Sequence, residues 1–124
     1  MSSRCPSSLI PRSARHLDVY RVTLELIVAA RPFLPRLKRF NRRLGSQLPD
    51  ALSSVLQNLA EAMRRTGADR AHLLTVALGS CDEARAILEA AVAFGVLEQT
   101  DVAVAEALAD RACAMMFRLR LRCL

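Results

Sequence analysis

Apolar residues recur along most of this chain at the three- and four-residue intervals that place side chains on one face of an α-helix. The first such segment covers residues 17–30. It should stop at Arg31 and Pro32, because a residue that precedes proline is pushed away from helical backbone angles. We expect its main inward face to comprise Tyr20, Leu24, Ile27 and Val28, widened by Val19, Val22 and Leu26.

The next segment, residues 31–45, is predicted to be a basic connection outside the helices. Its candidate anchors to the core are Leu34, Leu37, Phe40 and Leu44. A second helix is predicted over residues 46–66, and it should end before Gly67, because glycine readily adopts left-handed backbone angles. The inward positions of this helix are Leu48, Leu52, Val55, Leu59 and Ala62.

The second half of the chain predicts two longer helices. Asp69 is placed to cap a helix over residues 70–94 that Gly95 ends, and the last helix should run from about Thr100 and Asp101 to the C-terminus. Four helices with short connections over residues 16–124 predict an all-α, antiparallel, up-and-down four-helix bundle. Residues 1–15 are rich in serine and proline and show no periodicity, so we expect a flexible basic tail.

The last two predicted helices are apolar over more than one stripe. The residues concerned include Leu73, Val76, Cys81, Ile87, Leu88, Val92, Val104, Leu108, Cys113, Met115, Met116, Phe117 and Leu119. A single subunit would leave part of this surface exposed to water. We therefore expect a homo-oligomer built mainly on these two helices.

Composition supports the helical prediction and narrows the cellular location. Hydrophobic residues make up 52% of the chain but aromatic residues only 4%, so the core must consist mainly of Leu, Ala and Val. No apolar stretch approaches the roughly 20 residues of a membrane span. The four cysteines lack the spacing of a metal site. These observations predict a cytoplasmic protein with no membrane segment.

The net charge of +6 is distributed unevenly, because acidic residues dominate positions 49–110 and basic residues gather before and after them. Lys38 is the single lysine among 18 basic residues, and the planar fork of arginine binds phosphate or carboxylate with two bonds. We predict that RNA or DNA phosphates contact the clustered cations Arg31, Arg36, Lys38, Arg39, Arg42, Arg43, Arg64, Arg65, Arg118, Arg120 and Arg122.

The arrangement of the bundle and the scarcity of aromatic residues qualify this prediction. In an up-and-down bundle, Arg64 and Arg65 should lie at the opposite end from the cations of residues 31–43. Few aromatic side chains are available to stack on bases, so binding should be weakly sequence-specific. The alternative is a solvated surface whose charges compensate helix dipoles.

The sequence contains few of the residues and motifs that an enzyme active site requires. His16 and His72 are the only histidines, neither has a glutamate three residues before it, and no hydrolase, metalloprotease or phosphate-loop motif is present. Glu61 and Glu83 could face each other, but two carboxylates without histidine make a weak metal site. We therefore expect no enzymatic activity, no cofactor and no bound metal.

Several polar and small residues interrupt the apolar pattern, and we predict structural roles for them. Asn58 and Glu61 are expected to tie helices together by buried hydrogen bonds, with a polar binding spot as the alternative reading. Gly79 and Ser80 should allow a neighbouring helix to approach closely, either within the bundle or across a subunit boundary.

A set of these residues carries a family resemblance. The stretch from Gln47 to Ala62, with Asn58-Leu59-Ala60-Glu61-Ala62 near its end, precedes Arg64-Arg65 and then Ala77-x-Gly79-Ser80-x-x-Glu83. From about Leu17 to the C-terminus the chain resembles the bacterial four helix bundle proteins encoded by intervening sequences in large-subunit ribosomal RNA genes. Accessory proteins of diversity-generating retroelements (Avd) are relatives. The family's usual Asn-Ile-Ala-Glu-Gly ends here in Ala62, so its glycine is absent.

The resemblance implies an antiparallel four-helix bundle that assembles as a ring-like homopentamer. It also implies, from the retroelement relatives, an accessory protein that binds nucleic acid together with a reverse transcriptase. Two other hypotheses stay open: a scaffold module whose arginines meet an acidic protein partner, and a bundle that binds a metal or small ligand.

Overall fold

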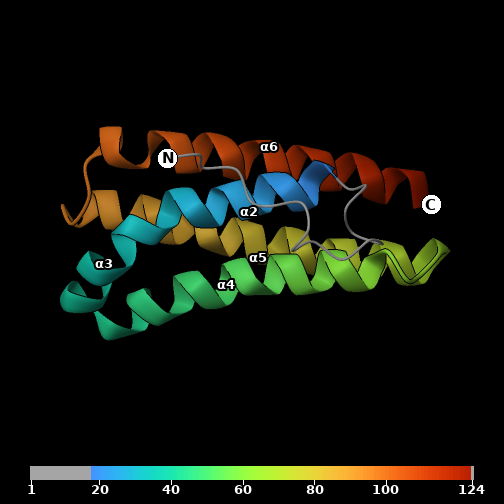
Figure 1. Ribbon diagram of the computed structural model, residues 1–124, viewed down its shortest axis with the longest axis horizontal. Helices are drawn as coiled ribbons and strands as arrows, with labels where there is room; N and C mark the ends of the chain where they lie inside the picture. Colours follow the sequence, from blue (N-terminus) through green and yellow to red (C-terminus); the bar gives the residue numbers. More distant parts are fainter. Residues whose placement is uncertain (1–17, 124) are drawn as a thin grey trace.

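The computed structural model describes residues 18–123, and within that range the chain forms helices and short turns with no strand (Figure 1). In chain order the elements are α2 (Asp18–Ala30), the 3-10 turn η2 (Arg31–Phe33), α3 (Leu34–Phe40), α4 (Arg42–Ala62), α5 (Gly67–Ala93) and α6 (Gln99–Cys123). The predicted tail of residues 1–15 lies outside the described residues.

The four long helices, α2, α4, α5 and α6, close into an antiparallel bundle (Figure 1). Helix α4 packs along α5, α5 packs along α6, and α2 contacts both α6 and α4, so each long helix has two neighbours. Their shared core is aliphatic, and its largest fully buried side chains include Leu26, Leu48, Leu59, Leu74, Leu88 and Met116. The predicted all-α four-helix bundle is confirmed for the single subunit.

Helix α2 buries a different face from the one predicted. Tyr20, Leu24, Ile27 and Val28 are only half-buried, whereas the buried residues are Val19, Val22, Thr23, Leu26 and Ala30. The Thr23 hydroxyl donates a hydrogen bond to the carbonyl of Val19 at 2.8 Å, which satisfies it inside the core. This helix is apolar on two adjacent stripes, and periodicity alone does not say which stripe meets the core.

The prediction that residues 31–45 form a connection outside the helices is wrong, because η2 and α3 make most of this segment helical. Pro32 and Pro35 each lie in the first turn of their element, where the missing N–H leaves no intrahelical hydrogen bond unmade. Leu37 is fully buried, as an anchor should be. Phe40 is 47% exposed, so it does not anchor the segment to the core.

Helix α4 begins at Arg42, earlier than predicted, because Asn41 caps it. The Asn41 side-chain oxygen accepts hydrogen bonds from the backbone N–H groups of Arg43 at 2.9 Å and Leu44 at 3.1 Å. Just inside the helix, a Cβ added to Gly45 would lie 2.6 Å from the Cα of Lys38. Glycine at this position therefore allows the backbones of α3 and α4 to touch.

The turn between α4 and α5 corrects two further predictions. Helix α4 ends at Ala62, before the predicted residue 66, and Gly67 has the expected positive φ of 53° but opens α5. Asp69 does not cap this helix: the N-cap is Thr66, which makes no side-chain capping bond, and Asp69 lies in the first turn. There its negative charge still favours the helix dipole.

The turn between α5 and α6 follows the sequence signals closely. Gly95, the second residue after α5, has a φ of 76°, as a left-handed terminator should. The carboxylate of Asp101 accepts a hydrogen bond from the backbone N–H of Glu98 at 2.9 Å, which fixes the start of α6. Within residues 18–123 no helix is long and apolar enough to cross a bilayer.

The prediction that Asn58 and Glu61 bond across helices is wrong, and the contact between helices is made by two serines instead. The hydroxyls of Ser54 on α4 and Ser80 on α5 lie 2.8 Å apart. Asn58 donates to the backbone carbonyl of Ser54 at 2.8 Å and to its hydroxyl at 3.2 Å, so Asn58 supports this contact from within its own helix. Glu61 forms no bond between helices but pairs with Arg65 of the same chain segment at 2.6 Å.

Glu61 and Glu83 do not face each other. The Ser54–Ser80 contact fixes the antiparallel register of α4 and α5, and it places Glu61 beside His72 and Leu73. Glu83 is about ten residues further along α5, a separation of roughly 15 Å along the helix. Gly79 is exposed, and a Cβ added there would meet nothing within 4 Å. The close approach expected at Gly79 is therefore not made within this subunit.

Candidate nucleic-acid interface

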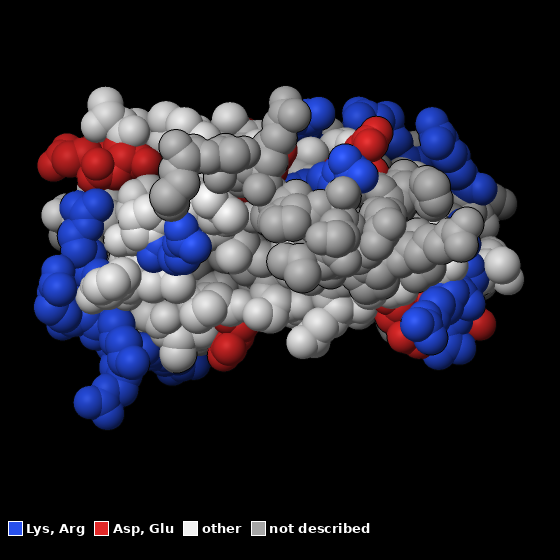
Figure 2. Space-filling model, viewed as in Figure 1, with Lys and Arg blue, Asp and Glu red and all other residues white. Residues whose placement is uncertain are grey.

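The predicted nucleic-acid-binding residues separate into two groups at opposite ends of the bundle. Helix α4 has 21 residues and so spans about 30 Å, with Arg42 and Arg43 at its start and Arg64 and Arg65 just beyond its end. Figure 2 shows basic side chains gathered toward both ends of the visible face. The separation expected from an up-and-down bundle is thus present.

We call the first group the α3 end. It lies where η2, α3 and the start of α4 cover one end of the bundle (Figure 1), and all its cations are exposed: Arg31, Arg36, Lys38, Arg39, Arg42 and Arg43. Within the described residues, one of them has an ion-pair partner: Arg36 lies 3.7 Å from Asp101. The others are exposed and have no ion-pair partner among residues 18–123, so their charges are available for an anion.

The α3 end also carries an aromatic pair that sequence reasoning missed. Phe40, the last residue of α3, and Phe94, directly after α5, have ring centroids 5.3 Å apart at an interplanar angle of 44°. They are 47% and 65% exposed. The only available signal was that both residues directly precede a helix-ending position, Asn41 or Gly95, where a side chain readily points outward.

The second group, which we call the C-terminal end, comprises the predicted Arg64, Arg65, Arg118, Arg120 and Arg122, and the neighbouring Arg70 lies with them. Its arginines are engaged with their own subunit to a greater extent. Arg65 pairs with Glu61, which raises the pKa of Arg65 through a hydrogen bond and charge attraction. Arg70 donates to the carbonyl of Ala62 at 3.0 Å. Arg120 lies over the ring of Phe117, with its central carbon 5.3 Å from the ring centroid.

A cavity of about 440 Å³ opens at the C-terminal end. It is lined by the last turn of α4, the first turns of α5 and the end of α6, and both Arg70 and Arg122 border it. The remaining lining is mostly apolar: Ala62, Met63, Thr66, Gly67, Leu74, Leu119 and Cys123. Two arginines beside a small apolar opening can hold a short anionic group, but they present no extended basic surface.

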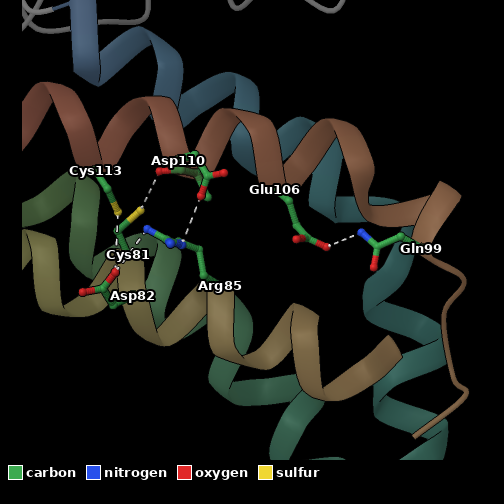
Figure 3. Close-up of polar contacts among 8 residues, drawn as sticks. Cys81, Asp82, Arg85, Gln99, Glu106, Asp110 and Cys113 are labelled. Carbon is green, nitrogen blue, oxygen red and sulfur yellow. Dashed lines mark hydrogen bonds and ion pairs between the residues drawn. The ribbon is translucent and has the colours of Figure 1, made fainter. Parts of the chain in front are cut away.

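Between the two ends, a thiol cluster lies across the seam of α5 and α6 (Figure 3). Cys81 is fully buried and donates to the carbonyl of Ala109 at 3.6 Å, while the sulfur of Cys113 lies 3.8 Å from a carboxylate oxygen of Asp82. Arg85 bridges the helices through ion pairs with Asp82 at 3.4 Å and Asp110 at 3.3 Å.

This cluster shifts the pKa values of its two thiols in opposite directions. The neighbouring Cys81 thiol lowers the pKa of Cys113 to about 7, against the opposing effect of burial and with further help from the Arg85 guanidinium. The same interaction between the thiols, together with burial, raises the pKa of Cys81. Cys113 is therefore the more acidic thiol. Among residues 18–123, no group of three or more His, Cys, Asp or Glu side chains is placed to hold a metal ion.

The sequence model of one protein family matches most of the chain. That family is described as 23S rRNA-intervening sequence protein, and the match covers residues 15–118. It therefore includes all four long helices, apart from the last residues of α6, and the whole α3 end. Neither a curated protein nor a solved structure is significantly similar to the chain.

Proposed function

The chain belongs to the 23S rRNA-intervening sequence protein family, and from that premise we propose that it is a non-enzymatic accessory protein that binds nucleic acid through its α3 end. The observation that carries this proposal is that the α3-end cations are exposed and mostly unpaired. Arg39, Arg42 and Arg43 are exposed within one short stretch of chain, and none of them has an ion-pair partner among residues 18–123. Guanidinium groups in this state form bidentate bonds to phosphate oxygens without first breaking a bond to their own protein.

The local backbone supports this assignment, because it holds the cations in place. Helix α3 is fixed by the buried side chain of Leu37 and by its backbone contact at Gly45. The start of α4 is fixed by the Asn41 cap. Cations on ordered helices bind phosphate with a smaller loss of conformational entropy than cations on a mobile loop.

We further propose that copies of the subunit assemble, which would multiply the α3 end. Large apolar side chains remain exposed on the two helices for which excess apolar surface was predicted, among them Val104 at 66% and Phe117 at 48% on α6. These two residues are thirteen positions apart and so lie about 140° apart around the helix. Two separate apolar faces suit a closed ring, in which each subunit uses one face for each neighbour. A pentameric ring is what the family resemblance implies.

The experiment that tests the proposal is a salt titration of binding. Fluorescence anisotropy would measure the affinity of the full chain for single-stranded RNA and for duplex DNA of equal length, from about 50 to 200 mM salt. Affinity should fall steeply with salt, because each phosphate contact releases a counterion. Binding that is absent at low salt, or unaffected by salt, contradicts the proposal.

A matched pair of variants locates the surface. The triple variant Arg39→Gln, Arg42→Gln, Arg43→Gln removes three cations from the α3 end, and Arg64→Gln, Arg65→Gln, Arg118→Gln removes three from the C-terminal end. For RNA, losing three phosphate contacts should lower the slope of log affinity against log salt by about 2. We expect this change in the first variant and a smaller one in the second. The reverse order would assign binding to the C-terminal end.

A second candidate function is a scaffold whose arginines meet an acidic protein partner. The observation that favours it is the Arg36–Asp101 pair, in which a cation of the α3 end already binds a carboxylate. Gene neighbourhood separates the two candidates: a reverse transcriptase gene with a variable repeat favours the accessory role, and an unrelated operon favours the scaffold. Docking of a reverse transcriptase and a cytoplasmic location stay predictions from the sequence.

A further inference from the structure

The contact between Phe40 and Phe94 does not explain why so much of both rings is exposed among the described residues. Phe33, by contrast, is buried, and Phe117 is covered on one face by Arg120. Phe40 and Phe94 contact each other and otherwise leave much of their rings in water, at 47% and 65% exposure. Exposed aromatic area of this kind is unfavourable in isolation and is enriched where a protein binds a partner.

The backbone that carries each ring is fixed by hydrogen bonds. Phe40 ends α3, and the next N–H, of Asn41, donates to Leu37 at 2.8 Å. The N–H of Phe94 donates to Ala90 at 2.8 Å, and Gly95 then turns the chain away. The two rings come from segments far apart in the sequence, so their contact also ties the α5–α6 turn to α3. The pair is thus a preformed platform at the edge of the bundle.

Cations surround this platform along the chain. Arg39 precedes Phe40, and Arg42 and Arg43 follow it within one turn of chain, all of them exposed. Aromatic faces offer stacking to the bases of a single-stranded nucleic acid, and neighbouring cations neutralise its phosphates. Stacking requires bases that are not paired, so a duplex would reach only the cations.

We propose that Phe40 and Phe94 form a stacking platform for unpaired bases, which makes single-stranded nucleic acid the preferred ligand of the α3 end. This inference rests on the proposed function, since it names the class of nucleic acid that the same surface takes. A second copy of the chain is a weaker occupant, because two α3 ends placed face to face would bring like charges together.

The test uses two probes with equal phosphate counts: a 12-nucleotide oligoadenylate and an abasic oligonucleotide of the same length. The variant Phe40→Leu, Phe94→Leu keeps an apolar side chain at each position and removes the aromatic face. The matched control is Phe117→Leu, which removes a ring of similar exposure (48%) at the C-terminal end. Affinities are measured by fluorescence anisotropy at fixed salt, and subunit mass by sedimentation.

We expect the wild-type protein to bind oligoadenylate more tightly than the abasic probe. The double variant should lose roughly 5-fold to 50-fold in affinity for oligoadenylate, with the abasic probe and the salt slope unchanged. Phe117→Leu should leave the ratio of the two affinities unaltered, because any change in assembly through α6 would affect both probes alike. Equal losses on both probes, or no loss on either, would overturn the stacking platform while leaving phosphate binding intact.

Two further outcomes identify other causes. A double variant whose sedimentation mass falls shows that the rings form an interface between copies of the chain, and this overturns the inference. A wild-type protein that binds neither probe at low salt overturns the proposed function as well. Far-ultraviolet circular dichroism of each variant confirms that the helices remain folded, and the single variant Phe94→Leu, after the end of α5, provides a second readout that leaves α3 unaltered.

Discussion

The two ends of this bundle carry similar numbers of arginines, but more of those at the C-terminal end are bonded within their own subunit, and only Arg64, Arg118 and Arg122 there are exposed without an ion-pair partner among residues 18–123. At the α3 end, Arg39, Arg42 and Arg43 are exposed on ordered helical backbone and lack ion-pair partners within the described residues. At the C-terminal end, Arg65 and Arg70 bond to their own subunit. Arginine count therefore does not identify a binding surface, because a guanidinium already bound within the subunit must lose that bond before it takes a phosphate.

The ends also differ in how their backbones are fixed. A short helix, α3, covers one end and touches α4 through Gly45, and Asn41 caps α4 beside it. At the other end, α4 passes into α5 through a turn in which the N-cap residue Thr66 makes no side-chain bond. We infer that a few identifiable residues hold the backbone of the α3 end in place, and that the backbone of the C-terminal end does not depend on such residues.

The largest expected effect tests the contact of α3 with α4. In Gly45→Ala, the new Cβ would lie 2.6 Å from backbone atoms of Lys38, so α3 must shift. Overpacking of this kind lowers the free energy of unfolding by about 1–3 kcal/mol. Chemical denaturation measures that loss, and RNA affinity should fall with it, because the cations of α3 move with the helix.

Gly79→Ala is the matched control for that substitution. An added Cβ at Gly79 meets no atom within 4 Å, and the residue lies inside α5. In the isolated subunit the change should raise the free energy of unfolding by roughly 0.5–1 kcal/mol, because alanine favours the helix. If copies pack against Gly79, sedimentation mass should fall instead. Equal stability of the two variants would contradict the tight contact at Gly45.

The next effect compares the caps at the two ends. Asn41→Ala removes the acceptor of two backbone N–H groups at the start of α4, which should lower the free energy of unfolding by about 1 kcal/mol. Thr66→Ala removes a side chain that makes no capping bond, so its effect should stay within about 0.5 kcal/mol. Thermal unfolding of both variants measures the difference. Similar losses from the two substitutions would show that the ends are not fixed differently.

Sequence patterns gave the four long helices and their order, because aliphatic periodicity and the glycines at positions 67 and 95 are local signals. They failed over residues 31–45, where Pro32 was interpreted as a helix stop although it lies in the first turn of η2. They also assigned Phe40 to the core, since spacing shows which residues share a face but not whether a neighbour covers it.

The sequence predicted that the candidate cations lie at two opposite ends of the bundle, but it did not predict which of them are bonded within the subunit. Antiparallel topology places the two arginine groups at opposite ends, and this follows from helix order alone. Which arginines are engaged depends on side-chain contacts such as Arg70 with Ala62 and Arg120 with Phe117. The contact between Phe40 and Phe94 joins residues 54 positions apart, so no local pattern contains it.

The smallest expected effect concerns the contact between α5 and α6, which lies between the two ends. It is an effect on the reactivity of Cys113 and not on the free energy of unfolding. Because the pKa of Cys113 is lowered to about 7, its thiolate accumulates as pH rises through 7, whereas an ordinary thiol with a pKa of roughly 8.5 would be only a few per cent ionised there. The alkylation rate of Cys113 with iodoacetamide, followed by peptide mass spectrometry, should reach half its maximum near pH 7. Arg85→Gln should move that midpoint upward, since Arg85 helps to stabilise the thiolate. If the alkylation rate of the folded wild-type protein instead reaches half its maximum near pH 8.5, α5 and α6 do not hold Cys113 against Cys81 and Arg85. The packing of α5 against α6 would then be looser than the structure shows.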